Sequence, residues 1–277
     1  IYKLADVSVP SISSVTSTID NGSYPIGSVV PISVIFDEPV IVTGTPKLLL
    51  ETGDIDKVID YSSGSGTSTL IFNYTVASGH ESSDLSYLYF FQPEQINIKD
   101  AAGNNADLTL PAPGATNSLS ANKDIVIDGI VPGIASTTIS DDNVYTTVTF
   151  SEGIYNTNGG TGGVEKEDFN ITLNQNGGTT TAVNIGSILN GSGQAPSGGE
   201  TVFNFNLNLT GVPNGVERIT ITPKSASVYD KAGNDASTIN QENNSVLLID
   251  NKPPQITFMD PIEFGHAEQI RKQSRWM

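Results

Sequence analysis

The chain of 277 residues contains no cysteine, two histidines and few basic residues. Without cysteine no disulfide framework can form, and a Cys/His zinc site has too few ligands. Lys and Arg number 13 against 30 Asp and Glu, which gives a formal net charge of −17. Phosphate backbones and anionic lipids repel such a chain, so we expect no nucleic acid partner.

Long apolar runs are missing too. No stretch approaches the roughly 18 apolar residues of a membrane-spanning helix, so we expect no membrane insertion. The first residues carry no secretory leader, and we interpret the sequence as a fragment of a longer chain. No stretch shows a sustained helical period, which argues against long helices.

The sequence repeats itself with a period of 122 residues. Pro10, Pro132 and Pro254 lie at this spacing inside similar phrases, and Asp128 and Asp250 end the matching phrases IVID and LLID. Internal repeats of this kind define the fold before any single motif does. We therefore expect two copies of one domain and the beginning of a third.

Two landmarks recur in the same order inside each copy. The phrase VIFDEPV at 34–40 corresponds to VTFSEGI at 148–154, and KDAAGNNA at 99–106 corresponds to YDKAGNDA at 229–236. The distance between the two landmarks differs from copy to copy, so the loops between them differ in length. The copies are sister domains and not duplicates.

The domain boundaries fall in the linkers between copies. The first domain covers residues 1–129 and the second covers 130–251, each long enough to bury a core of its own. Residues 252–277 hold the start of a further repeat, followed by a basic stretch that begins at Phe264. This reversal of charge predicts a tail added during cloning, and a genuine basic C-terminal peptide is the alternative.

Alternating apolar and polar residues predict β-strands. Residues 201–209 (TVFNFNLNL) alternate over their whole length, which is typical of a half-buried strand, and residues 69–76 occupy the matching place in the first copy. Turns rich in glycine and asparagine separate such runs. We predict an all-β fold of two tandem immunoglobulin-like β-sandwich domains joined end to end.

In such a sandwich the termini lie at opposite poles, and the strand directions decide which loops meet there. They bring three acids together at the junction of the two copies and three more at the outer pole of the first copy. The junction set is Asp128, Glu152 and Asp230, and the outer set is Asp6, Glu38 and Asp100.

Carboxylates gathered in this way point to calcium, which prefers six to eight oxygen ligands. At the junction we expect Asn234 and linker carbonyls to complete the set. A bound cation would remove the repulsion between the acids and fix the angle between domains. The alternative is that Asp230 only accepts backbone N–H bonds in its turn and Asp128 only flanks the linker.

Signals for catalysis are weak. His80 is the only histidine inside the repeats, and its polar surroundings predict an exposed loop position. A Ser-His-Asp triad needs a positioned histidine, and the second copy has none. We predict no catalytic residue, no organic cofactor and no enzyme activity.

One aromatic run, YLYFF at 87–91, leaves a different function open. Its alternation predicts that Tyr87, Tyr89 and Phe91 share one face of a strand. Such a face either packs in the core or binds sugars. We favour the core.

The phrases FSEG at 150–153, NQNGG at 174–178 and DKAGN at 230–234 make the second copy resemble the SwmB-type repeat of very large bacterial surface proteins. The first copy resembles a sister immunoglobulin-like repeat through GTPKL at 44–48 and YSSGSG at 61–66. The resemblance implies a non-enzymatic extender or adhesin segment of a bacterial cell-surface or secreted protein, often stiffened by calcium.

The partners implied by this resemblance are neighbouring repeats of the same chain, surface glycans or another cell surface, and we expect an extracellular monomer. The alternative function is a carbohydrate-binding module of a surface protein or secreted enzyme.

Overall fold

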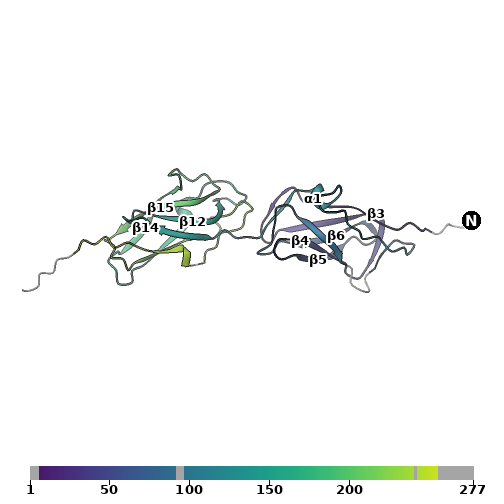
Figure 1. Ribbon diagram of the computed structural model, residues 1–277, viewed down its shortest axis with the longest axis horizontal. Helices are drawn as coiled ribbons and strands as arrows, with labels where there is room; N and C mark the ends of the chain where they lie inside the picture. The colour runs from purple at the N-terminus through teal and green to yellow at the C-terminus, as the bar shows by residue number, and fades with distance from the viewer. Residues whose placement is uncertain (1–5, 92–96, 240–241, 255–277) are drawn as a thin grey trace, which may run out of the picture.

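The computed structural model describes residues 6–91, 97–239 and 242–254, and these fold almost entirely into β-strands. This confirms the all-β prediction. The strands gather in two lobes that lie in line and are connected by one linker (Figure 1). The chain enters the first lobe at its outer end and leaves the second lobe at the opposite outer end.

The first lobe contains most of its strands in one antiparallel sheet. Its order is β1-β3-β6-β5-β4-β8, with β9 beside β3, and a small second sheet has the order β2-β10-β7. The elements are β1 (Ile12–Ser17), β2 (Gly22–Tyr24), β3 (Val29–Thr43), β4 (Lys47–Glu51), β5 (Lys57–Ser63), β6 (Thr67–Thr75), β7 (Glu81–Ser82), β8 (Ser86–Phe91), β9 (Asn97–Lys99), the short helix α1 (Leu119–Asn122) and β10 (Ile125–Asp128).

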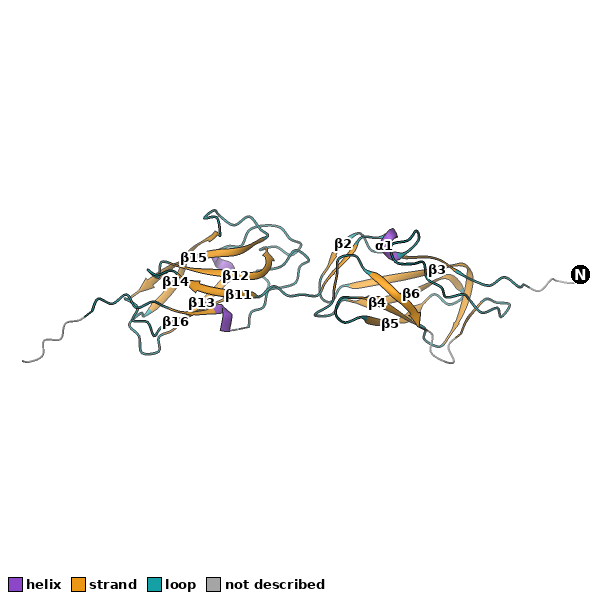
Figure 2. Cartoon of the chain, viewed as in Figure 1, coloured by secondary structure: helices purple, strands orange, loops and turns teal. Residues whose placement is uncertain are grey.

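The second lobe divides its strands between two antiparallel sheets, with the orders β11-β12-β15-β14 and β13-β16-β17 (Figure 2). Two single turns of 3-10 helix, η1 and η2, lie in its connections. The elements are β11 (Ile134–Ile139), β12 (Tyr145–Ile154), η1 (Lys166–Asp168), β13 (Phe169–Asn174), β14 (Ala182–Asn190), β15 (Glu200–Thr210), β16 (Arg218–Pro223), η2 (Glu242–Asn244) and β17 (Ser245–Leu247).

The pairing of the first two long strands is the same in both lobes. A bulge follows Ile12 where β1 pairs with β3, and a bulge follows Ile134 at the same place between β11 and β12. β3 and β12 then bend. The bend interrupts the pairing of β3 with β6 between Ile35 and Val40, and the pairing of β12 with β15 between Thr149 and Ile154. Glu38 and Glu152 lie in these bends, so the bend directs both side chains to the end of their lobe.

Each lobe buries a separate apolar core. The core of the first lobe draws only on residues from Ile12 to Ile127, and the clusters of the second lobe only on residues from Ile134 to Leu248. Along β15 the inward residues include Phe203 and Phe205, which confirms the predicted alternation. Edge-to-face ring contacts fill this core, with the Phe169 and Phe205 centroids 4.9 Å apart.

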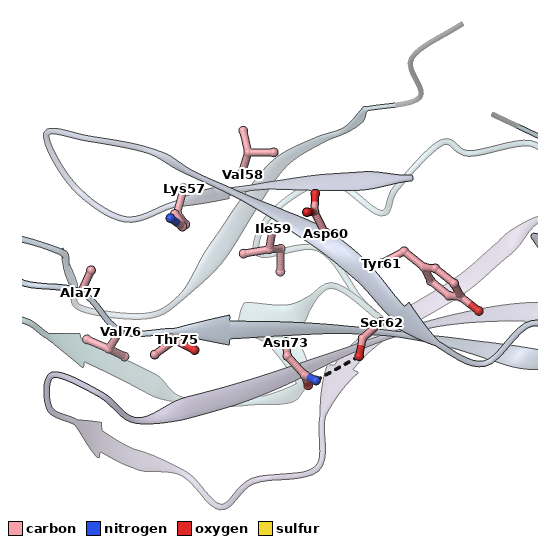
Figure 3. A pocket seen from close by; sticks show the side chains of 10 residues that line it. All are labelled: Lys57, Val58, Ile59, Asp60, Tyr61, Ser62, Asn73, Thr75, Val76 and Ala77. Atoms are coloured by element: carbon pink, nitrogen blue, oxygen red, sulfur yellow. Dashed lines mark hydrogen bonds between the residues drawn. The ribbon is translucent and has the colours of Figure 1, made fainter. Parts of the chain in front are cut away.

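The first lobe has an open groove where β5 leaves β6. β5 pairs with β6 only at Tyr61 and Ser63, while Lys57 to Asp60 pair with β4. The groove between the diverging strands has a volume of about 630 Å³ (Figure 3). The Asn73 side chain donates a hydrogen bond of 3.1 Å to Ser62 Oγ at the end where the strands meet.

Two expectations about side chains in the first lobe are wrong. His80 is 7% exposed, because its ring stacks on Tyr74 and its Nδ1 lies 2.9 Å from the Tyr74 hydroxyl. Tyr87 and Tyr89 do not share a face, since a bulge between them leaves Tyr87 1% exposed in the core and Tyr89 54% exposed. The Phe91 side chain and the proposed tail lie outside the described residues.

No helix among the described residues is long and apolar enough to span a membrane.

Candidate metal centre

The structure gathers both predicted sets of acids. In each set, one carboxylate oxygen from every member lies within 4.8 Å of the others. Oxygens on opposite sides of a calcium ion are about 5 Å apart, since each lies 2.3–2.6 Å from the metal. The spacing therefore suits a cation of this size. The sets are Asp128, Glu152 and Asp230 at the junction and Asp6, Glu38 and Asp100 at the outer pole.

The junction aspartate Asp230 is fully buried and is held by its own turn. Its Oδ1 accepts hydrogen bonds from the backbone N–H of Gly233 at 2.6 Å and of Asn234 at 2.9 Å. Its Oδ2 accepts one from the Asn234 side-chain nitrogen at 2.7 Å. Gly233 has φ +106°, a conformation that glycine adopts without strain. A lone pair on Oδ2 is left for a cation.

The outer pole has the same turn. Asp100 Oδ1 accepts hydrogen bonds from Gly103 N at 2.6 Å and Asn104 N at 2.8 Å, and Asp100 Oδ2 accepts one from Asn104 Nδ2 at 2.6 Å. The turn chemistry that the sequence left as an alternative to metal binding is thus present in both lobes. It leaves one face of each carboxylate available, so the two interpretations are compatible.

The linker aspartates are tied to these turns through their backbone oxygens. Asn234 Nδ2 donates to Asp128 O at 2.9 Å, and Asn104 Nδ2 donates to Asp6 O at 3.2 Å. Asp128 Oδ1 also accepts the N–H of Ile130 at 3.2 Å, which closes a small turn in the linker. Each linker is thereby fixed beside the acidic turn that follows it in the fold.

Asn234 makes a contact that the sequence did not predict. Its side-chain oxygen accepts a hydrogen bond of 2.9 Å from the backbone N–H of Ile26, which belongs to the first lobe. Its nitrogen, which cannot bind a cation, faces Asp128 and Asp230. In this arrangement Asn234 connects the two lobes through its side-chain oxygen, and its role as a metal ligand stays a prediction.

A fourth acid at the junction, Glu81, escaped the sequence analysis. β7 pairs antiparallel with β10 so that Glu81 lies opposite Asp128. Together with Glu152 they line a cleft of about 400 Å³ between the lobes. The comparison of the two copies missed Glu81 because Glu81 belongs to no motif that recurs in the second copy.

The junction is electrostatically strained. Burial, followed by the charges of Asp230, Asp128 and Glu81, raises the pKa of Glu152 to about 7. Burial also raises the pKa of Asp128, and the charges of Asp230 and Glu81 add to the effect. Both shifts are those of carboxylates that lack a compensating positive charge. A divalent cation in the cleft would relieve the repulsion.

The pKa of Asp100, in the outer turn, is shifted in the opposite direction. Burial by itself raises the pKa of Asp100, but hydrogen bonds from the Asn104 side chain and from the turn backbone outweigh it and lower the pKa. The turn therefore stabilises an ionised aspartate without any metal. The electrostatic repulsion between carboxylates is therefore a feature of the junction between the lobes.

Neither a protein-family model nor a curated protein matches this chain.

Proposed function

We propose that the chain is a non-enzymatic extender or adhesin segment of a large bacterial cell-surface or secreted protein, in which calcium at the junction holds two immunoglobulin-like lobes in line. The observation that carries the proposal is the junction cluster. Its carboxylates come from the first lobe (Glu81), the linker (Asp128) and the second lobe (Glu152, Asp230). A cation bound by all of them would join three parts of the chain.

The strand orders support the immunoglobulin-like part of the proposal. The second lobe has a sheet of four strands, β11-β12-β15-β14, and a sheet of three, β13-β16-β17. Constant-type immunoglobulin sandwiches have this division, with sheets A-B-E-D and C-F-G. The first lobe repeats the first four positions as β1-β3-β6-β5.

The test is calcium binding by the full chain, measured by titration calorimetry and by thermal unfolding with and without EDTA. We expect binding heat and a higher unfolding midpoint with calcium. Glu81→Gln weakens both effects, because Glu81 contributes charge and an oxygen at the junction. Asp54→Asn, a change of the same size at an exposed acid outside both clusters, is the matched control. Absence of binding heat, with a midpoint that EDTA does not change, overturns the calcium part of the proposal.

The glycan-binding alternative has less support. Sugar sites need aromatic side chains that present a face to solvent. Among the described aromatic residues the most exposed are Tyr89 (54%) and Tyr145 (40%), which belong to different lobes and form no shared platform. A glycan array with the full chain separates the two functions, since an extender without adhesive function binds no glycan.

A further inference from the structure

The linker aspartates share one backbone hydrogen bond but are followed by different residues. In each, Oδ1 accepts the backbone N–H of the residue two positions later, at 3.0, 3.2 and 2.9 Å. The aspartates, 122 residues apart, are Asp6, Asp128 and Asp250, and the residues that follow them are Val7, Gly129 and Asn251.

Gly129 is built into the end of the first lobe. Its N–H donates to His80 O at 2.7 Å, and its carbonyl accepts the N–H of Gly79 at 2.9 Å. A Cβ at position 129 would lie 2.2 Å from Ala77 O and 2.7 Å from His80 O. These are backbone atoms, and the loop is anchored where His80 stacks on Tyr74. Only glycine fits here.

The second lobe ends differently and accepts a side chain at the same place. Asn251 N donates to Pro213 O at 3.1 Å, and the Asn251 side chain donates to Asp142 O at 3.2 Å. The loop that provides Pro213 is held by the buried carboxylate of Glu217, which accepts the N–H of Asn214 at 3.0 Å. A residue with a Cβ, such as Val7, suits an end of this kind.

The turn that reaches Asn234 is also specific to the first lobe. It runs from Pro25 to Ser28, closes with a hydrogen bond of 3.1 Å from Ser28 N to Pro25 O, and presents Ile26 N to the second lobe. The second lobe connects β11 to β12 through residues 140–144 alone and has no room for such a turn. The two lobes therefore end in different surfaces.

We propose that the end of the first lobe, formed by the turn at 25–28 and the loop at 77–81, is an interaction surface that selects the repeat which follows it. It accepts a repeat whose linker has glycine after the aspartate and whose acidic turn ends in an asparagine like Asn234. It excludes a second copy of the first lobe, whose linker has Val7. Repeats of the first type then never follow one another directly. This order rule rests on the proposed function, in which the lobes belong to an array.

The test measures the distance between the lobes in the full chain. The chain has no cysteine, so Ser63→Cys and Thr172→Cys place one spin label on each lobe. All variants are compared in EDTA, so that the result does not depend on calcium. Gly129→Val introduces the residue of the first linker and is expected to broaden the distance distribution at least twofold. Val7→Gly, at a side chain that is 81% exposed, is the matched control and leaves the width unchanged.

A second variant covers the case in which Gly129→Val disturbs the first lobe. Ile26→Pro removes the N–H that bonds to Asn234 and keeps the turn, because Gly27 has φ +85° and proline suits the position before it. It is expected to broaden the distribution as well. The proposal is overturned if the distance distribution of Ile26→Pro, or of a folded Gly129→Val chain, is as narrow as that of the parent. It is also overturned if Val7→Gly broadens the distribution as much as Gly129→Val does. Narrowing of the parent distribution by added calcium tests the proposed function separately.

Discussion

Substitution of the junction glutamate Glu152 by glutamine tests whether the acids repel one another in the absence of metal. The pKa of Glu152 is raised from 4.5 to about 7 in the folded chain. Between these values the unfolded chain loses the proton and the folded chain retains it, so stability falls as the pH rises from about 4.5 to about 7. Above about pH 7 the full penalty is present.

The size of the penalty follows from the shift. Each pKa unit corresponds to about 1.4 kcal/mol, so the rise from 4.5 to about 7 gives a ceiling of about 3.5 kcal/mol. Water screens a carboxylate that is only partly buried, so we expect about 1 to 2 kcal/mol. Glu152→Gln removes the ionisation and stabilises the second lobe by this amount at pH 8 and not at pH 4. For a lobe of this size the unfolding midpoint rises by about 4–8 °C.

Differential scanning calorimetry in EDTA at pH 4 and pH 8 measures the effect. Glu38→Gln is the matched control, because Glu38 occupies the same bend at the outer pole, where the described chain has no second lobe. We expect a smaller change there. Saturating calcium should reverse the sign at Glu152, since glutamine is a poorer ligand than carboxylate. An equal midpoint for the variant and the parent at pH 8 refutes the reasoning, as does an increase of the same size at pH 4.

Three further predictions concern the stability of the lobes. Burial raises the pKa of Glu217, but hydrogen bonds from backbone N–H groups outweigh burial and lower this pKa to about 2. The contribution of Glu217 to stability is therefore present above about pH 4.5 and is lost as the pH falls towards 2. Glu217→Gln should cost about 2–3 kcal/mol of unfolding free energy at pH 7 and less at pH 3, measured by urea unfolding. Phe203→Ala should destabilise the second lobe by about 3–5 kcal/mol and leave the unfolding transition of the first lobe unchanged. A shift in the transitions of both lobes would contradict separate cores. Gly233→Ala should destabilise the second lobe more than Gly103→Ala destabilises the first. Both glycines have positive φ, but only at Gly233 would the new Cβ meet another side chain, 2.2 Å from Asn158 Oδ1. Equal changes of the unfolding midpoint in the two variants would exclude that contact.

The sequence predicted those features that depend on periodicity and repetition. The alternation in residues 201–209 identified β15, because one face of that strand packs in a core. The meeting of Asp128, Glu152 and Asp230 followed from strand direction alone. Both depend on local pattern and chain direction, which the sequence contains.

The features that it missed depend on contacts between loops. Glu81 belongs to no motif that recurs in the second copy, so the comparison of the copies did not identify it. His80 is buried because Tyr74 offers both a ring face and a hydroxyl, and a polar stretch of sequence gives no sign of such a partner. Tyr87 and Tyr89 part because one bulge shifts the alternation of the strand.

The acidic turn has the same hydrogen bonds in both lobes, which determines how the junction is assembled. Asp100 and Asn104 make at the outer pole the bonds that Asp230 and Asn234 make at the junction, with distances that agree within 0.1 Å. At the outer pole no second lobe of the described chain contacts the turn, so the turn forms without a contact of the kind that Ile26 makes. The bond from Ile26 to Asn234 is then added to a turn that already exists. Its loss should therefore free the lobes to move relative to each other without unfolding either, which is why Ile26→Pro is expected to change the distance between lobes and leave their unfolding midpoints unchanged.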